Sequence, residues 1–175
     1  MVRAAVVALI LAGLLAALWI AELRAREHGW TWACQNNLQC LQVALYVYAQ
    51  DYDGRLPLRP AEGDFVAVRW PVHLHGKFLP EQPGPIFPYI KNAGLFGCPG
   101  GWRHFRDGSA PPAYEWNLDL SGKRLDDVAD LPLLWCGGPW HRKGLTGPAG
   151  RNVVLVKGTP HWMDEDEFQA MRRSK

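Results

Sequence analysis

The feature that most constrains this chain is an uncharged apolar run near its amino terminus. Residues 4–21 contain no Asp, Glu, Lys or Arg and consist almost wholly of Ala, Val, Leu and Ile. As a helix this run would be about 27 Å long, close to the roughly 30 Å hydrocarbon core of a bilayer. Trp19 stands near its far end, where an amphipathic ring suits the membrane interface, and Glu22 and Arg24 follow. The sequence therefore predicts a transmembrane anchor over residues 1–23.

A cleaved secretory signal is the alternative, because Arg3 before an apolar run also fits the start of a signal peptide. Cleavage requires small residues at alternating positions, and Trp19 is unsuited to that role before Glu22. We therefore favour a retained anchor. Since the amino-terminal stub is short, we expect residues 24–175 to lie outside the cytoplasm.

A second helical pattern follows the anchor. Its apolar positions are spaced alternately by four and three residues, with polar residues mostly on the other faces. Gly54 can adopt positive φ and Pro57 cannot continue a helix, so the pattern ends there. We predict one helix from about Arg3 to Asp53, with Gly29 as its weak position, whose second half must bury the stripe. The stripe comprises Cys34, Leu38, Leu41, Leu45, Tyr48 and Tyr52.

The remaining sequence predicts a small antiparallel sheet with long Gly- and Pro-rich loops. Leu131–Cys136 and Val153–Val156 are apolar runs that suit buried strands, and His161–Met163 follows a turn. Asp164 can cap a final helix over Glu165–Arg173. Further candidates are strands over 64–70 and 114–120 and a short helix over 86–95. The predicted class is α+β: a long amino-terminal helix packed on a small antiparallel sheet.

Composition and spacing argue against several functions. The chain has 19 Lys and Arg against 17 Asp and Glu, which removes the electrostatic case for nucleic-acid binding. The four cysteines have no CxxC spacing, so we predict no zinc ribbon. His73 and His75 have no third ligand nearby. We therefore expect neither a metal nor another cofactor.

The cysteines also bear on redox state and catalysis. Cys34 and Cys40 lie on different faces of the predicted helix and cannot pair. Cys98 and Cys136 lie outside it and are candidates for a disulfide in an oxidising compartment. Cys136 with His141 could supply a thiol nucleophile and a base, but no third orienting group is evident. We do not expect an enzyme.

Nine tryptophans in 175 residues is a high number. We expect Trp116, Trp135 and Trp162 to fill the interface between helix and sheet. Trp102 and Trp140 stand in Gly- and Pro-rich loops beside Arg and His, so they are candidates for an exposed surface that binds a ligand or glycan.

Several segments occur in the order found in a known family. They are Leu23–Glu27, Cys34–Leu38, Ala44–Pro57, Tyr89–Asn92, Leu95–Pro99, Trp116–Leu118, Asn152–Gly158 and His161–Met163. Together they resemble bacterial type IV pilin-like proteins, and more closely the secretion pseudopilin-like group with a carboxy-terminal H-X9-DG signature. The resemblance spreads over residues 4–163. It implies a single-pass protein of the bacterial inner membrane that assembles with pilin-like subunits or other proteins of a secretion apparatus.

The sequence departs from this family at both ends. The family opens with a basic leader and a Gly-Phe-Thr-Leu-Ile-Glu cleavage and methylation site, whose glutamate would fall near Arg3. We expect either a start further upstream or a lost leader, and a lost leader would remove the support for polymerisation. Lys157 replaces the aspartate of the closing motif, and fifteen residues instead of nine separate it from His141. Related pseudopilins can bind calcium in a later loop, for which the candidates here are Asp126, Asp127 and Asp130.

Two functions follow from these observations. The first is a membrane-anchored, pilin-like structural subunit of a secretion or surface filament apparatus. The second is a non-polymerising single-pass protein whose external domain binds a surface ligand or glycan through Trp102 and Trp140.

Overall fold

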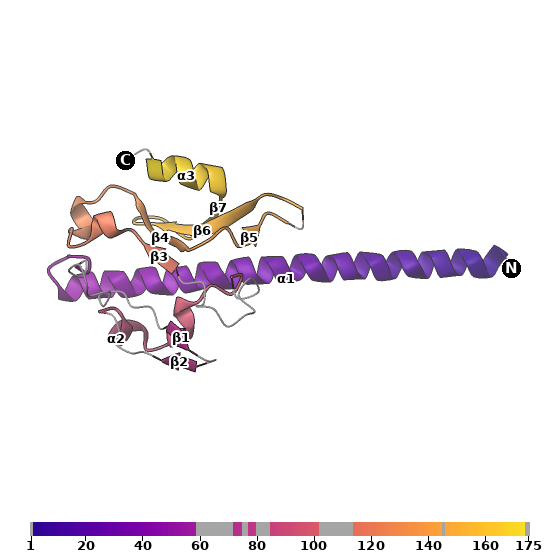
Figure 1. Ribbon diagram of the computed structural model, residues 1–175, viewed down its shortest axis with the longest axis horizontal. Coiled ribbons are helices and arrows are strands. Elements are labelled where there is room, and N and C mark those ends of the chain that lie inside the picture. The colour runs from indigo at the N-terminus through magenta and orange to yellow at the C-terminus, as the bar shows by residue number, and fades with distance from the viewer. Residues whose placement is uncertain are drawn as a thin grey trace.

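One helix dominates the computed structural model. The structure describes residues 2–58, 72–74, 77–79, 85–101, 114–144 and 146–173. Helix α1 runs without a break over Val2–Asp51, so it is about 75 Å long. Figure 1 shows its carboxy-terminal half inside a compact head and its amino-terminal half projecting alone. The prediction of a single helix from Arg3 to Asp53 is therefore confirmed to within two residues at each end.

The turn that ends α1 contains Gly54, which has the positive φ that the sequence predicted. Asp53 and Gly54 both have positive φ, 53° and 75°. The Gly54 N–H donates to the carbonyl of Ala49 at 2.7 Å, which satisfies one of the helix's last carbonyl groups in a Schellman-type arrangement. The chain leaves the helix towards residues 121–125, where Leu56 N–H donates to the Lys123 carbonyl at 2.9 Å.

Five antiparallel strands form the main sheet, with β6 at its centre. On one side of β6 lies β4, followed by β3, and on the other side lies β7. The two-residue β5 pairs with the start of β6, where His141 lies opposite Gly150. The strands are β3 (Tyr114–Trp116), β4 (Pro132–Cys136), β5 (His141–Arg142), β6 (Ala149–Leu155) and β7 (His161–Asp164). The predicted α+β class and the strands expected around 131–136, 153–156 and 161–163 are confirmed.

Smaller elements correct two predictions. The helix expected over 86–95 is divided into α2 (Phe87–Ile90) and a 3-10 turn η1 (Ala93–Phe96), because Lys91 is left-handed with φ 51°. The strand expected over 114–120 ends at Trp116, because the Asn117 side chain accepts from the Asp119 N–H and starts a 3-10 turn. The remaining elements are β1 (Val72–Leu74) paired with β2 (Lys77–Leu79), η3 (Leu118–Leu120) and η4 (Leu125–Asp127). The strand predicted over 64–70 lies outside the described residues.

The sheet buries both of its faces. In Figure 1, α1 lies against one face and α3 (Glu165–Arg173) covers the other, while α2 lies on the far side of α1. Neighbouring side chains point to opposite faces in the paired part of β4 and β6. Leu134 and Val154 join the core around α1, whereas Trp135 and Val153 join a second core under α3. We had expected Trp116 and Trp135 to fill the interface between α1 and the sheet. Trp116 does so, whereas Trp135 packs under α3.

The predicted stripe on α1 is the helix's main contact with the head. Cys34, Leu38, Leu41 and Leu45 are buried, and Tyr48 is half-buried against the same core. Tyr52 differs, since 53% of it is exposed and it stacks on Tyr48 with ring centroids 4.2 Å apart. It lies in the turn directly after Asp51, the last residue of α1. Gln42, Ala44 and Ala49 of α1 are also buried, although they do not belong to the predicted stripe.

The final helix agrees with its prediction. Helix α3 covers Glu165–Arg173, and the Asp164 carboxylate accepts the N–H of Glu167 at 2.7 Å, as an N-cap does. Phe168 is fully buried and packs on Trp135, with ring centroids 5.6 Å apart. This pair closes the second core.

The amino-terminal half of α1 contacts no other part of the described chain through a buried surface. Residues 2–23 are exposed throughout, including large apolar side chains such as Leu9 and Leu15. The helix is long and apolar enough to cross a membrane, and none of its most apolar window is buried. The helix therefore joins an apolar projecting segment to the core of the head in one rigid element.

Candidate metal centre

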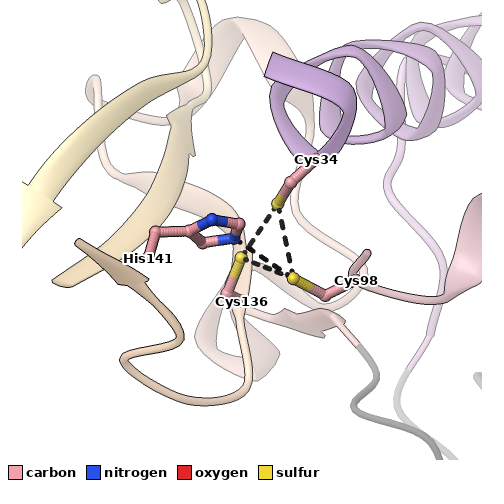
Figure 2. A group of neighbouring side chains, drawn as sticks. All are labelled: Cys34, Cys98, Cys136 and His141. Carbon is pink, nitrogen blue, oxygen red and sulfur yellow. Dashed lines mark hydrogen bonds between the residues drawn. The ribbon is translucent and has the colours of Figure 1, made fainter. Parts of the chain in front are cut away.

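Four buried side chains converge where α1 enters the head (Figure 2). Cys34 comes from α1, Cys98 from the turn after η1, Cys136 from the end of β4 and His141 from the start of β5. The sulfur of Cys136 lies 3.0 Å from that of Cys34 and 3.6 Å from that of Cys98. The third sulfur pair, Cys34 with Cys98, is 3.7 Å apart. The Nε2 atom of His141 lies 3.2 Å from the Cys98 sulfur, and all four potential ligand atoms lie within 4.8 Å of one another.

Each side chain is placed by a distinct local cause. Cys34 is the first buried position of the stripe on α1. Cys136 points to the α1 side of β4 because the alternation along this strand turns Trp135 to the other side. His141 is held by its pairing with Gly150 in β6. Cys98 opens a turn closed by the Gly101 N–H, which donates to the Cys98 carbonyl at 3.0 Å.

Gly100 in this turn allows the imidazole to approach. A Cβ atom at Gly100 would lie 2.6 Å from His141 Cε1 and 3.0 Å from Nδ1. Real Cβ atoms do not approach a ring so closely, so only glycine leaves the imidazole in its place. The turn and the histidine are therefore packed as one unit.

A hydrogen bond on the far side of the ring sets the orientation of His141. The Thr31 hydroxyl donates to the Glu27 carbonyl at 3.0 Å, so its oxygen is left to accept a hydrogen bond. That oxygen lies 3.3 Å from His141 Nδ1. Protonation at Nδ1 satisfies this contact and leaves the Nε2 lone pair directed at the sulfurs. In this tautomer the imidazole can act as a ligand through Nε2.

Further polar contacts surround the group. Asn152 is fully buried, donates to the Thr31 carbonyl at 3.1 Å and accepts from Gln35 at 3.2 Å. Arg151 donates to the Cys136 carbonyl at 3.1 Å and forms a bidentate ion pair with Glu165 at 2.7 and 2.8 Å. These contacts fix the backbone of two of the four elements that supply the sulfurs and the ring.

The thiols have strongly shifted pKa values. Burial raises the pKa of Cys136 well above its usual value, and it also raises the pKa of Cys98. Burial opposes ionisation of Cys34 as well, but hydrogen bonds from Cys136, Cys98 and His141 outweigh it and hold the pKa of Cys34 well below its usual value.

The arrangement is unsuited to nucleophilic catalysis. Cys136 is 0% exposed and His141 is 1% exposed, so a substrate cannot reach them in this conformation. Reactive cysteines are partly exposed and have lowered pKa values, whereas burial raises that of Cys136. Thiolates and a neutral imidazole in a buried tetrad are instead typical of a structural metal site.

The structure places only some of the predicted site residues together. Cys98 and Cys136 are close together, but both are free thiols and a third sulfur lies equally near. Trp140 is half-buried and packs against the core around α1, whereas Trp102 lies outside the described residues. His75 also lies outside them.

The calcium candidates are not gathered into a ligand set. Asp126 and Asp127 belong to η4, and Asp130 instead accepts the backbone N–H of Lys157 at 2.9 Å. Within the described ranges, the three cysteines and His141 are the one group in which at least three potential metal ligands lie close together.

Spacing along the chain conceals this group. Its cysteines are 64 and 38 residues apart, and each ligand lies on a different element. The absence of CxxC pairs excludes a zinc ribbon, but it does not exclude ligands that tertiary structure brings together. The available signals were a cysteine at the start of the stripe and another before Pro99-Gly100-Gly101.

Comparisons with protein-family models, curated proteins and solved structures found no match to this chain.

Proposed function

We propose that the chain is a membrane-anchored, pilin-like structural subunit that assembles with similar helices in a bacterial secretion or surface filament apparatus. Its main support is the continuity of α1, which joins an exposed apolar segment to the centre of the head. The resemblance of segments along residues 4–163 to pseudopilins adds to this support.

The physical reason lies in what can cover the projecting half of α1. About 20 apolar residues are stable in lipid, and they can leave lipid only when other apolar surfaces replace it. Neighbouring helices of the same kind provide such a surface. The bilayer would then hold subunits with their heads outside the cytoplasm until they enter a helical assembly through heterologous contacts.

The head is consistent with a structural role. The four chemically reactive side chains described above are buried, and Trp140 contributes to the core. We therefore propose no catalytic activity and no ligand site at Trp140. The single-pass, non-polymerising protein remains the contrary outcome of the experiment.

Site-specific photo-crosslinking tests the assembly. Leu9 and Leu11 are both exposed on α1 and lie about 200° apart around the helix axis, so together they sample two opposite faces. Each would be replaced in turn by benzoyl-phenylalanine in the full chain, expressed in its native cells and irradiated in intact membranes. We expect covalent adducts with a second copy or with other proteins that carry an apolar amino-terminal helix, identified by mass spectrometry.

The matched control places the same probe at Asp166, an exposed residue of α3 far from the anchor. It should yield none of these adducts if packing runs through α1. Adducts with lipid alone at both positions of α1 would contradict assembly and leave a solitary single-pass protein. Recovery of the chain in the soluble fraction would contradict the anchor itself.

A further inference from the structure

We propose that Cys34, Cys98, Cys136 and His141 bind one zinc ion that fastens α1 to the sheet at the base of the head. This metal site does not depend on assembly into a filament, since its ligands all come from within one chain.

The spacing of the ligand atoms fits a tetrahedral ion. Zn–S bonds of about 2.3 Å and Zn–N bonds of about 2.0–2.1 Å place two sulfurs about 3.8 Å apart and a sulfur and a nitrogen about 3.5 Å apart. The sulfur pairs here are 3.0, 3.6 and 3.7 Å apart. The contact between the Cys98 sulfur and His141 Nε2 is 3.2 Å. The remaining separations, from His141 to the sulfurs of Cys34 and Cys136, lie within 4.8 Å. Closing the shell therefore requires the Cys34 and Cys136 sulfurs to move apart and the imidazole to move towards them.

The donor set selects the class of metal. Three thiolates and an imidazole are soft or borderline ligands, which favour zinc over calcium or magnesium. All four positions of a tetrahedron are filled by protein, so no position is left for water or a substrate. A closed site of this kind is structural, not catalytic.

A disulfide accounts for the group less well. It would join two of the three sulfurs and leave the third thiol buried beside the new bond, with His141 unused. The three sulfurs lie within 3.0–3.7 Å of each other, and no pair is separated from the third. A single ion uses all four side chains and replaces the thiol protons with a cation.

The outer contacts of the group are those that a metal ligand requires. Metal-bound histidines nearly always donate their second N–H to an acceptor that fixes the ring. Thr31 provides that acceptor, and Gly100, which has no Cβ, leaves room for the ring to pack against its backbone. Thr31 is a positioning residue in this site, because it acts on the metal through His141.

The ion would join parts of the chain that are far apart in sequence. Cys34 belongs to α1, Cys98 to the turn after η1, and Cys136 and His141 to β4 and β5, which both pair with β6. A metal that binds the folded state and not the unfolded one stabilises the fold through its own binding free energy. Removing zinc should therefore loosen the contact between α1 and the sheet first.

The primary test uses the unaltered full chain, purified in detergent with a thiol reductant and supplied with zinc. Elemental analysis should find one zinc per chain after dialysis. X-ray absorption should give three sulfur neighbours at about 2.3 Å and one nitrogen neighbour at about 2.0–2.1 Å. A shell dominated by oxygen, or zinc well below one per chain, would overturn the proposal. So would a disulfide among the three cysteines in a parallel sample isolated without reductant and alkylated at once.

Variants then assign the ligands. Cys98→Ser should lose bound zinc, whereas Cys40→Ser should retain one ion, because Cys40 is a half-buried cysteine outside the group. Cobalt titrated into the unaltered chain is an independent readout that does not depend on the folding of Cys98→Ser. Sulfur-to-cobalt charge transfer and a strong tetrahedral ligand-field band are expected, and a weak octahedral spectrum would contradict the site.

The role of Thr31 has its own readout. Thr31→Val removes the acceptor for Nδ1 and should weaken zinc affinity by about 10- to 100-fold, as loss of an outer-shell partner does. The three-sulfur, one-nitrogen shell should persist at saturating zinc. Unchanged affinity would show that Thr31 does not position the ring.

Discussion

The amide of Gln42 forms a buried polar connection between α1 and the end of β6. Gln42 is 2% exposed, and its Nε2 atom donates to the carbonyls of Leu155 and Gly158 at 3.0 and 2.9 Å. These carbonyls bound the turn between β6 and β7. Changing Gln42→Met keeps the length of the side chain and removes both donors, so it tests whether this turn is held by hydrogen bonds or by shape alone.

The expected cost follows from what the two carbonyls lose. A hydrogen bond contributes about 1 kcal/mol net, and an acceptor left buried without a partner costs about 1–3 kcal/mol. Leu155 and Gly158 are half-buried, so water can reach part of their surroundings and the lower end of the range applies. Better burial of the apolar Met offsets some of the loss. We expect the free energy of unfolding to fall by about 2 kcal/mol.

Thermal unfolding of the full chain in detergent, followed by circular dichroism, measures this change. For a protein of this size the melting temperature should fall by about 4–8 °C. Gln50→Met is the matched control, because Gln50 lies exposed on the same helix and its replacement should cost less than about 0.5 kcal/mol. Equal melting temperatures for the two variants would refute the assignment of a structural role to the Gln42 amide.

Three further changes test other parts of the structure. The hydrogen bonds from Arg151 hold the pKa of Glu165 below its ordinary value, so the pair stabilises the fold above about pH 4.3 and this contribution disappears as the pH falls through the lowered pKa. Unfolding of the unaltered chain and of Glu165→Gln should differ by about 1 kcal/mol at pH 7 and converge in acid, and a constant difference would contradict the pairing. Phe168→Ala should cost about 3–5 kcal/mol in denaturant unfolding, because its ring fills the core under α3, and a cost below about 1 kcal/mol would argue against that packing. Gly29→Ala should raise the helicity or leave it unchanged, because a Cβ there meets nothing within 4 Å. The free energy of unfolding should rise by up to about 1 kcal/mol. A fall in that free energy would indicate a packing role for Gly29.

Local patterns were sufficient to predict the long helix and the carboxy-terminal part of the head. The stripe from Cys34 to Leu45 has a strict helical period, and the sequence Asp53-Gly54 stops it by adopting positive φ. Helix α3 was predicted to its ends because Asp164, the last residue of β7, supplies its cap. These signals act over a few residues, so no knowledge of the tertiary structure is required.

The errors arose where a single residue overrides a longer pattern. Lys91 adopts a left-handed conformation and divides the helix expected over 86–95, although its side chain gives no warning of this. Asn117 diverts the strand that starts at Tyr114 into a 3-10 turn. Trp135 could not be assigned to a face, because both faces of the sheet are buried and hydrophobicity does not distinguish them.

The tetrad could be predicted only in part, for a reason that lies in its geometry. Cys34 was correctly placed in the core by its position in the stripe. The candidate disulfide between Cys98 and Cys136 is not formed, since both are free thiols with their sulfurs 3.6 Å apart. The third sulfur and the histidine depend on the path of β4 into β5 and on how α1 crosses the sheet. Closely spaced ligands can be read from a sequence, whereas ligands from four elements require the fold.

The position of the tetrad gives the two proposals a common mechanical consequence. Cys34 is the first residue of α1 that the head buries, so any force on the anchor enters the head at this point. The nearby polar contacts of α1 with the sheet are single hydrogen bonds, which would break one at a time under load. They join Gln35 and Thr31 to Asn152, Thr31 to His141, and the Cys34 carbonyl to the Tyr114 hydroxyl. Metal–thiolate bonds at Cys34 would distribute the same load over the loop at Cys98 and the strand end at Cys136. A zinc-free head should therefore detach from α1 at a lower pulling force than the zinc-bound head. Equal rupture forces would mean that the apolar stripe alone carries the load.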